Sequence, residues 1–398
     1  MTGPVVTGPF ALGAALAERE QVGLLRNRIA TDGASGGRLR VAGREYFNFS
    51  ANDYLGLADH PAIKTAFNAG IERYGAGSGA SPLVTGYSRA HQELEETLAE
   101  WLGVEAVLLF NCGFSANQAV LKALLGKEHL LWQDKLNHAS LQEMGSQLPC
   151  KMKRFAHNDM AALERQLEPN RGLIVSEGVF SMDGDQAPWA ELAALAARSG
   201  NWLMIDDAHG LGVLGPEGRG TLAAQGVPPA SVHIQMGTFG KALGVAGAFV
   251  GGSRELVEYL VNFARHYVYS THMPAAQACA VSKSIQLVRA AEDARAHLGQ
   301  LIARFRQGAK DLGWQLGASD TPIQPLLVGE SSVALQLAER LRERGIWVSA
   351  IRPPTVLVGT ARLRITLSAA HREQDVDRLL DALGVCPAVT TLGEAHHD

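Results

Sequence analysis

Lys241 is the residue in this chain with the clearest capacity for chemistry. It stands in the glycine-rich run Gly237-Thr238-Phe239-Gly240-Lys241-Ala242-Leu243-Gly244, and mostly apolar residues follow. A lysine removed from water loses its proton more readily, and the free amine is a nucleophile that forms a Schiff base with a carbonyl compound. A loop lysine can also extend its charge into water, and the local sequence weighs the two interpretations about equally.

Phosphate binding is a weaker interpretation of this run. The glycine expected five residues before Gly240 is missing, and Ala242 stands where Ser or Thr would bind magnesium. A second glycine-rich loop at residues 75–81 can supply N–H groups to an anion or simply turn the chain, and we favour the turn.

Asp206 is a second residue with a capacity for chemistry, because its carboxylate needs a cationic partner. It continues the apolar run 202–205, and a carboxylate buried alone there would be costly. Pyridoxal phosphate (PLP) has a cationic ring nitrogen that needs an acidic partner and an aldehyde that needs a lysine. Asp206 and Lys241 can serve both ends of this cofactor, and His209 can hydrogen-bond its phenolic oxygen.

His138 follows another strand pattern, and its flat imidazole could stack on the ring of such a cofactor. A lone loop histidine is more often structural, so this role needs other support. Metal binding by His138, Asp206 and His209 is the alternative for these side chains. It is disfavoured, because their spacing is not that of HExxH or CxxC sites and because it leaves Lys241 unexplained.

Short apolar runs that alternate with helical patterns must position these residues. The runs are 106–110, 130–132, 172–176, 202–205, 232–236 and 248–250. Alternating strands and helices predict an α/β fold with a mostly parallel sheet and helices on both faces. Ligands of such sheets bind at the carboxyl ends of the strands. The polar residues expected at those ends are His138, Glu177, Ser181, Asp206, His209 and Lys241.

The junction after residues 106–110, which read as a buried parallel strand, has the form of a phosphate site. The run stops at Asn111-Cys112-Gly113-Phe114-Ser115, and a helical pattern begins at once. Free N–H groups and the positive end of the helix dipole attract phosphate at such a place. Every βα unit has a similar junction, so the signal is weak by itself.

Patterns along the rest of the chain suggest its organisation. A helical arm is expected at about residues 15–28 after a loose leader, a hairpin around Gly43, a helix ending at Gly103, and one long helical stretch from about 275 to 312. We expect an N-terminal arm and hairpin at 1–48, a large cofactor domain at 49–289, a smaller α+β domain at 290–384 and a flexible tail at 385–398.

Composition sets broad limits. The chain has 398 residues, 46% of them hydrophobic and 19% charged, with a formal net charge of −4. This balance is that of a globular protein and favours neither nucleic acid nor an anionic membrane as a partner. Four cysteines without a pairing pattern suggest free thiols in the cytoplasm. No apolar run is long enough to span a bilayer, and no signal-peptide pattern is present.

Seven blocks, in order along the chain, resemble the α-oxoamine synthases, a family of fold-type I PLP-dependent enzymes. The blocks are Asn48 to Leu57, Gly75 to Gly79, Asn111 to Asn117, Asp134 to Ser140, Glu177 to Gly184, Asp206 to Gly210 and Thr238 to Lys241. Any one block is weak evidence, but the ordered set is specific. One departure is Cys112, where we would expect serine.

This resemblance implies a role for each site residue. It implies that Lys241 binds PLP and moves a proton, that Asp206 pairs with the ring nitrogen, and that His209 meets the phenolic oxygen. His138 would stack on the ring and assist proton transfer. The remaining implied cofactor contacts are Gly113, Phe114, Ser181, Thr238 and, across a homodimer interface, Ser270 or Thr271. The implied substrate contacts are Asn52, Arg352 for an amino-acid carboxylate, and Arg28 or Arg26 for the acyl group.

The segments 351–356, 359–364 and 269–274 most resemble family members that condense L-alanine with pimeloyl-CoA or pimeloyl-acyl carrier protein, in biotin biosynthesis. The alternatives are a sister enzyme that uses glycine and a short acyl-CoA, a PLP aminotransferase, and a non-catalytic subunit of the same fold. The block 351–355 argues against an aminotransferase. Retention of Lys241, Asp206 and His209 argues against a non-catalytic subunit.

Overall fold

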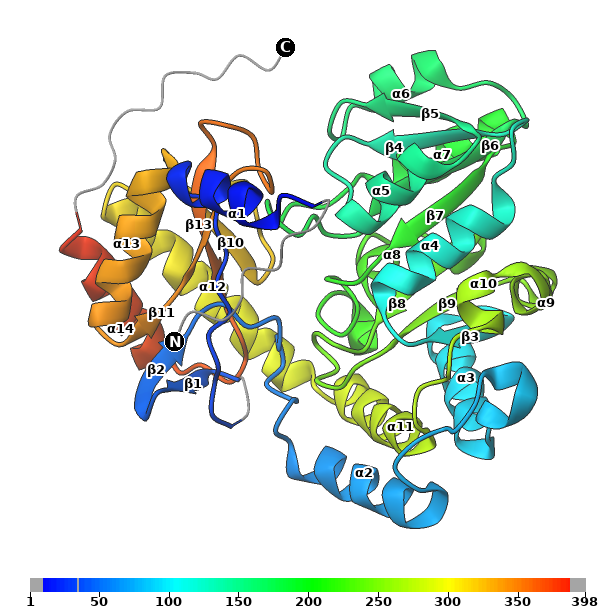
Figure 1. The fold of residues 1–398 in the computed structure, drawn as a ribbon, viewed down its shortest axis with the longest axis horizontal. Helices are drawn as coiled ribbons and strands as arrows, with labels where there is room; N and C mark the ends of the chain where they lie inside the picture. The colour runs from blue at the N-terminus through cyan, green and yellow to red at the C-terminus, as the bar shows by residue number, and fades with distance from the viewer. Residues whose placement is uncertain (1–9, 34–35, 387–398) are drawn as a thin grey trace.

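The computed structural model describes residues 10–33 and 36–386. Residues 1–9 of the expected leader, and the expected tail beyond Cys386, lie outside the described residues. The chain forms a larger lobe and a smaller lobe that lie side by side (Figure 1). The larger lobe is built on one seven-stranded sheet, and the smaller lobe contains two three-stranded sheets.

The seven-stranded sheet confirms the predicted α/β architecture. Its strands, in spatial order, are β3 (Ala106–Phe110), β9 (Ala248–Gly252), β8 (Ile234–Thr238), β7 (Trp202–Asp206), β6 (Gly172–Glu177), β4 (Leu130–Asp134) and β5 (Lys151–Phe155). Strands β8, β7, β6, β4 and β5 are mutually parallel, and β9 is antiparallel to both of its neighbours. The parallel pairing expected for residues 106–110 is therefore wrong, because within the described part of the chain β3 pairs with β9 alone, and that pairing is antiparallel. The sequence pattern also missed β5, whose residues are largely polar because it lies at the sheet edge.

Successive residues of the central strands point to opposite faces of this sheet. Leu131 and Met204 face an apolar cluster under the helices α4 (Gly113–Leu124), α5 (Ala139–Gln147), α9 (Arg254–Phe263) and α10 (Arg265–Val268). Their neighbours Trp132 and Leu203 face a second cluster under α6 (Met160–Gln166), α7 (Trp189–Ser199) and α8 (Thr221–Ala224). Because both faces are covered, the strands read as continuous apolar runs.

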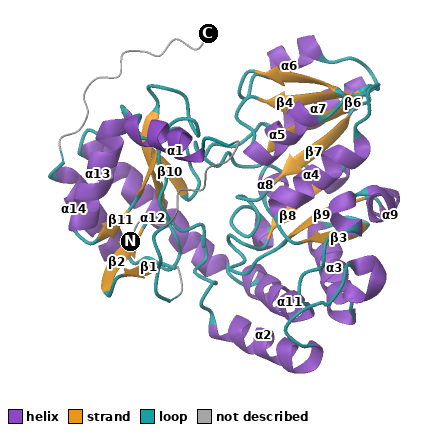
Figure 2. Ribbon diagram, in the orientation of Figure 1, coloured by secondary structure: helices purple, strands orange, loops and turns teal. Residues whose placement is uncertain are grey.

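Three long helices form the lower part of the larger lobe (Figure 2). They are α2 (Pro61–Tyr74), α3 (Arg89–Leu102) and α11 (Ala275–Arg289). The single helix expected at 275–312 is wrong, because the chain breaks at Ala290-Ala291 and continues as α12 (Glu292–Asp311). The arm helix also differs from expectation, since α1 covers only Leu12–Gln21 and buries none of its residues.

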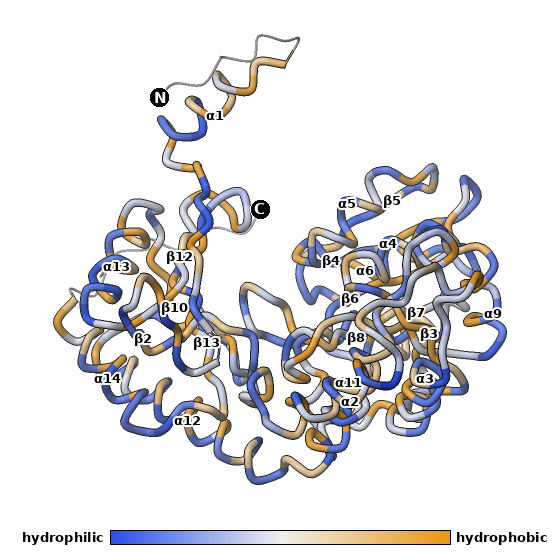
Figure 3. The backbone as a smooth tube through the Cα atoms, turned by 60° about the horizontal axis from the view of Figure 1, so that its bottom comes forward, coloured by the Kyte–Doolittle hydropathy of each residue, from blue (hydrophilic) through white to orange (hydrophobic). Residues whose placement is uncertain are grey.

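The smaller lobe is built from segments near both ends of the chain. The hairpin predicted around Gly43 is confirmed as β1 (Arg38–Val41) and β2 (Arg44–Asn48), and β2 pairs with β11 (Ile346–Trp347) from the C-terminal part. The other sheet contains β10 (Ile323–Gly329), β13 (Ala361–Thr366) and β12 (Ser349–Ile351). Helices α12, α13 (Ser331–Glu343) and α14 (Glu373–Gly384) pack around these sheets, while α1 projects outward (Figure 3).

Within the described part of the chain, no helix is both long enough and apolar enough to cross a membrane.

Candidate active site

The carboxyl ends of four parallel strands bring polar side chains to one edge of the large sheet. The last residues of β4, β6, β7 and β8 are Asp134, Glu177, Asp206 and Thr238. This is the edge at which the sequence predicted a ligand site. The three carboxylic residues are almost fully buried, so their charges are not simply solvated.

Lys241 lies in a tight turn just after β8. Its carbonyl accepts the N–H of Gly244, and Phe239 N–H reaches across the turn to Gly247. Gly244 has a φ of 66°, and a Cβ there would lie 2.5 Å from the backbone of Leu57, so glycine is required. Gly240 is different, because a Cβ there would meet only a side-chain oxygen at 3.8 Å.

Burial lowers the pKa of Lys241 to about 8, although Asp206 and Glu177 oppose this effect. The positive charge of Arg364 lowers the pKa of Lys241 further. Lys241 is half-buried, and its lowered pKa favours the reactive amine over the solvated lysine of the two interpretations. An amine with this pKa is partly unprotonated near neutral pH and can react with an aldehyde.

A chain of hydrogen bonds links Asp206 to His138. Asn117 Nδ2 donates to Asp206 Oδ2 at 2.7 Å and to Ser140 Oγ at 2.9 Å. Ser140 Oγ lies 2.8 Å from His138 Nδ1, and Ser140 N–H also donates to that nitrogen. Asn117 and Ser140 stood in the recognised blocks without an assigned role. The sequence did contain a clue to both residues. Each is a polar residue near the start of a predicted helix, on the side that faces the protein interior, where a polar side chain needs a hydrogen-bond partner.

His138 is the N-cap residue of α5 and lies near the start of α4. Its ring and that of Phe114 meet edge to face, with centroids 6.4 Å apart. Burial lowers the pKa of His138, with Asp206 opposing and Lys241 adding to the effect. The neutral ring is suited to stacking on a flat cofactor, as predicted for it.

The start of α4 offers an uncapped set of backbone N–H groups. Cys112 is its N-cap residue, and its side chain makes no capping hydrogen bond. Ser115 Oγ instead donates to the Cys112 carbonyl at 2.9 Å. The N–H groups of Gly113 and Phe114 therefore remain available to an anion. The substitution of cysteine for the expected serine leaves these backbone contacts intact.

His209 is buried beside Tyr54. The tyrosine hydroxyl lies 2.6 Å from His209 Nδ1. Burial lowers the pKa of His209 well below its usual range, with further lowering by Lys241, Arg364 and His138. Burial also raises the pKa of Tyr54 to about 12, so its hydroxyl keeps its proton. One nitrogen of a neutral His209, Nε2, is left for a ligand.

Arg364 is a site residue that the sequence reasoning missed. This buried arginine of β13 donates through Nε to the Ser181 carbonyl at 2.7 Å and through Nη1 to Asn52 Oδ1 at 3.1 Å. It thus gathers two predicted site residues, and its charge acts on Lys241. Its alternation with apolar residues in 361–367 was visible, but that pattern also fits a solvent-facing arginine.

The predicted substrate arginines lie apart from this cluster. Arg352 donates to the backbone carbonyls of Gly23 and Leu25, and Arg26 Nη2 donates to Thr355 Oγ1 at 3.2 Å. These segments line a cavity of about 800 Å³. Between the two arm arginines, Arg26 is the one that makes a contact. Arg28 has no hydrogen bond or ion pair within residues 10–33 and 36–386.

The remaining predicted contacts lie close to the same edge. Thr238 Oγ1 donates to the Gly247 carbonyl at 2.8 Å. The carbonyl of Thr271 accepts a hydrogen bond from Asn111 Nδ2 at 2.8 Å, just before α4 of the same chain. Ser270 precedes it and is half-buried.

The residues present fit PLP. Lys241 supplies an amine, Asp206 an acidic partner for a ring nitrogen, and α4 an anion site, all at one sheet edge. Asn117 Oδ1 and Glu177 Oε1 are buried without a hydrogen-bond partner in the described part of the chain, as expected where a ligand completes a polar pocket. Among the described residues, no group of three or more His, Cys, Asp or Glu side chains is arranged to hold a metal ion.

Known proteins resemble the chain over its whole length. The family model for aminotransferase class I and II matches residues 44–383. The 8-amino-7-oxononanoate synthase of Aeromonas hydrophila subsp. hydrophila is 87% identical over 396 residues, covering 100% of both chains. The enzyme of that name from Cronobacter sakazakii is 53% identical over 381 residues, which cover 95% of this chain and 99% of the relative.

Solved structures agree with these relatives. Serine palmitoyltransferase from S. paucimobilis, solved with a bound PLP–myriocin aldimine, has a TM-score of 0.88 at 26% identity, covering 94% of this chain and 96% of that chain. The predicted fold-type I architecture and PLP as cofactor are thereby confirmed. The chain belongs to the aminotransferase class I and II family and, within it, to the 8-amino-7-oxononanoate synthases.

Proposed function

We propose that this chain condenses L-alanine with a pimeloyl thioester to give 8-amino-7-oxononanoate, CO2 and the free thiol carrier, a step of biotin biosynthesis. The observation that carries this proposal is the 87% identity over the whole chain to an enzyme of that name. The site agrees with it, since Lys241, Asp206, His209 and His138 meet at one sheet edge.

PLP, when bound, supplies a ring that takes up the electrons left on the substrate α-carbon after a bond there is broken. The chain contributes the groups that hold the ring and move protons. Lys241 Nζ would hold the aldehyde carbon of PLP, and as a free amine it would carry the α-proton of alanine. Asp206 would pair with the ring nitrogen and stabilise its proton, His209 Nε2 would hydrogen-bond the phenolic oxygen, and His138 would stack on the ring.

Phosphate binding falls to the start of α4. The N–H groups of Gly113 and Phe114, with Thr238 nearby, are suited to hold it. We also propose a homodimer in which Ser270 or Thr271 reaches the partner's cofactor. Exposed apolar side chains support it, because Val84 is 73% exposed on η1 (Pro82–Gly86), which packs on α10, and Tyr269, directly after α10, is 69% exposed.

Substrate recognition is assigned to residues that border this site. Asn52 and Ser181 flank Arg364, and Ser181 lies near the ring in our proposal. Arg352 remains our candidate for the alanine carboxylate, with Arg364 as the competing arginine because its charge already reaches Lys241. Arg26, rather than Arg28, is the better candidate for the acyl group, since it lines the cavity that Arg352 also lines. We also propose that the protein is located in the cytoplasm.

Turnover assays with purified holoenzyme test the function. Alanine is compared with glycine, and pimeloyl-CoA with pimeloyl-acyl carrier protein and acetyl-CoA. We expect the highest kcat/KM for alanine with a pimeloyl donor. A preference for glycine with acetyl-CoA would replace the proposal by the sister reaction.

Two arginine variants decide which residue holds the alanine carboxylate. Loss of that ion pair raises the alanine KM more than it changes kcat, because ground-state and transition-state binding are weakened equally. Arg352→Ala and Arg364→Ala are therefore compared at saturating pimeloyl donor. An unchanged alanine KM in the Arg352 variant would remove Arg352 from this role.

A further inference from the structure

Glu177 is a buried carboxyl group for which the proposed reaction has no task. It ends β6 and lies directly opposite Asp206, which ends β7, in the parallel register of these strands. Residues paired in this way have their side chains on the same face of the sheet, and adjacent strands are only about 4.8 Å apart. Glu177 and Asp206 are 2% and 4% exposed, so two carboxyl groups share one buried edge.

Their hydrogen bonds differ in a way that separates their charges. Asp206 accepts from Asn117 Nδ2 and from the N–H of Ala208, and both bonds favour a carboxylate. Glu177 Oε1 has no partner in the described part of the chain. The backbone N–H of His138 donates to this carboxyl group, but a buried charge with one oxygen left without a partner is disfavoured. Asp206 is therefore the better place for the negative charge, and Glu177 the better place for a proton.

The groups that face Glu177 agree with this assignment. Burial raises the pKa of Glu177 well above its usual range, and the charges of Asp206 and Asp134 add to that effect. Lys241 and the backbone N–H of His138 oppose it without overcoming it. A buried carboxyl group this close to a second negative charge keeps its proton to a higher pH than an isolated one.

The protonation of Glu177 matters for Lys241. A carboxylate at Glu177 raises the pKa of Lys241 and so favours its ammonium form. A neutral Glu177 leaves one carboxylate, Asp206, for the single positive charge of the ring nitrogen. A second carboxylate there would lack a cationic partner whenever Lys241 is engaged with the aldehyde.

We propose that Glu177 is a positioning residue that holds a proton beside Asp206, so that the site offers the ring nitrogen one negative charge and Lys241 stays ready to lose its proton. This proposal deepens the proposed function and rests on it for the role of the ring nitrogen. The protonation of Glu177 itself can be measured without cofactor or substrate.

Infrared spectra of the cofactor-free protein test this protonation. A protonated carboxyl has a C=O stretching band that is distinct from the carboxylate bands. We expect the difference between the parent chain and Glu177→Gln to contain this band at pH 8.5. Glu95→Gln is the matched control, because Glu95 is half-buried and also has a buried, unpartnered Oε1, but burial raises its pKa only to about 7. Its band is expected to be lost by pH 8.5.

The effect on Lys241 is measured by the pH dependence of the rate at which added PLP acquires the absorption band of its lysine-bound form. Glu177→Gln replaces one neutral group by another, so the midpoint is expected to stay in place. A fall of about one pH unit would show that Glu177 was ionised and would overturn the proposal. Absence of the infrared band would overturn it equally.

Asp206→Asn keeps the test available if the Glu177 variant does not fold. Removal of the neighbouring charge is expected to lower the pH at which the Glu177 band disappears, and an unmoved band would contradict the pairing. Failure of the proposed reaction would look different. It would leave the infrared results unchanged and would show itself only in the turnover assay.

Discussion

Lys241 depends on its surroundings for its reactivity. Burial lowers its pKa to about 8, and Arg364 on the smaller lobe contributes to the same shift from across the site. The negative charge of Asp206 opposes this shift. The lysine is thus balanced between an ammonium ion and a free amine at a pH close to neutral.

The attachment of PLP to Lys241 should depend on pH in a predictable direction. Only the unprotonated amine attacks an aldehyde, so the rate is expected to rise with pH and to level off above about 8. Arg364→Gln removes a cation and should move the midpoint to higher pH. Arg362→Gln is the control, because it changes a second arginine of the same strand that is engaged with Asp183. Stopped-flow absorbance provides the rates, and coincident midpoints for the two variants would contradict the argument.

Removal of the amine should separate cofactor binding from cofactor attachment. Lys241→Ala keeps Asp206, His209, His138 and the start of α4, so PLP is expected to bind without the lysine-bound absorption band. Turnover is expected to fall by roughly 10²–10⁴-fold or more, because both the attachment point and the proton carrier are lost. Spectra after gel filtration and a turnover assay check both effects. Turnover at the parent rate would refute the assignment of Lys241.

Cys112 reports on the phosphate site at the start of α4. It is the exposed member of the four cysteines, which are all unpaired. A phosphate held by the neighbouring N–H groups of Gly113 and Phe114 should shield the thiol. PLP is expected to slow the alkylation of Cys112 by a maleimide, as followed by peptide mass spectrometry. Half-buried Cys279 serves as the internal control, and equal protection of both thiols would indicate a general change in the protein.

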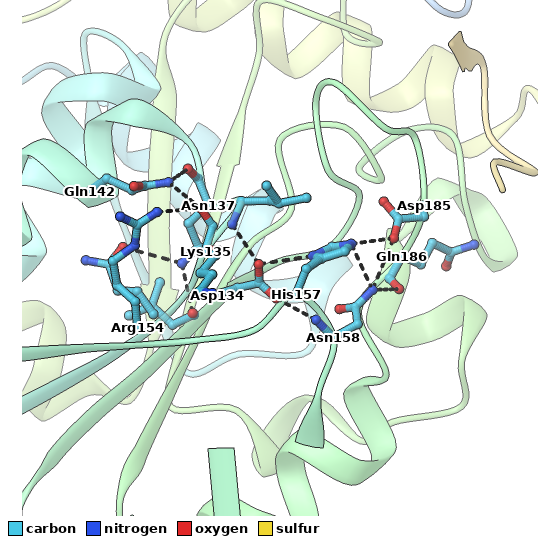
Figure 4. A network of polar contacts seen from close by, with 12 residues as sticks. Asp134, Lys135, Asn137, Gln142, Arg154, His157, Asn158, Asp185 and Gln186 are labelled. Carbon is cyan, nitrogen blue, oxygen red and sulfur yellow. Dashed lines mark hydrogen bonds and ion pairs between the residues drawn. The ribbon is translucent and has the colours of Figure 1, made fainter. Parts of the chain in front are cut away.

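At the scale of elements, the segment 178–187 connects the site to the rest of the molecule. On one side, Ser181 and Asp183 meet Arg364 and Arg362 of β13. On the other side, Asp185 accepts from His157 Nε2 at 2.7 Å, and Asp134 lies 3.0 Å from His157 Nδ1 (Figure 4). The histidine therefore fastens this segment to the ends of β4 and β5.

His157 is an imidazolium ion in its contacts with Asp134 and Asp185. Burial alone would lower its pKa, but hydrogen bonds to Asp134 and Asp185 outweigh burial and raise the pKa to about 10. A pKa raised above the unfolded value contributes stability that is complete below about pH 6.5 and is lost as pH rises through about 10. Loss of the ion pairs of His157 with Asp134 and Asp185 should therefore lower the free energy of unfolding by an amount that depends on pH.

His157→Gln should lower the free energy of unfolding most near pH 6.5, and the difference from the parent chain should shrink toward pH 10. Denaturant titrations across this range measure the difference. His129→Gln is the control, because His129 is a surface histidine whose ring lies near Glu128. A deficit of constant size for His157→Gln would mean that packing, and not the charged pair, carries the effect.

At the scale of the whole molecule, the smaller lobe supplies part of the site. Arg364 comes from β13, and its partner Asn52 follows the hairpin strand β2. The same lobe carries Arg352 and the cavity that Arg26 lines. Substrate groups would therefore be read by residues that lie far in sequence from Lys241, so the orientation of the two lobes sets the geometry of the reaction.

A homodimer with shared sites makes a prediction for mixed subunits. Lys241→Ala and a Ser270→Ala/Thr271→Ala double variant are each expected to have low activity alone. Co-refolded together, they should regain activity, because one of the two sites in a mixed dimer has an intact Lys241 and an intact partner segment. Sedimentation velocity confirms the assembly state. No recovery in dimers shown to be mixed would place Ser270 and Thr271 outside the shared site.

The sequence by itself determined much of this protein. Apolar periodicity located the buried strands and most helices, because burial on both sheet faces leaves a continuous apolar run. Polar residues directly after those runs had to meet, since parallel strands end at one edge. That argument predicted the neighbourhood of Asp206, His209, His138 and Lys241. It failed for β5 and for the Ala290-Ala291 break, where local pattern carries little information about the edge or the kink.

Only the tertiary structure decided which distant residues complete the site. Arg364 lies 123 positions after Lys241 in the numbering, and nothing in its local pattern distinguishes a buried arginine from an exposed one. The hydrogen bonds of Asn117, Tyr54 and His157 likewise join segments far apart in sequence. Burial and the charges of such neighbours set the pKa of Lys241, because desolvation and Coulomb energies depend on distances in space and not on spacing along the chain.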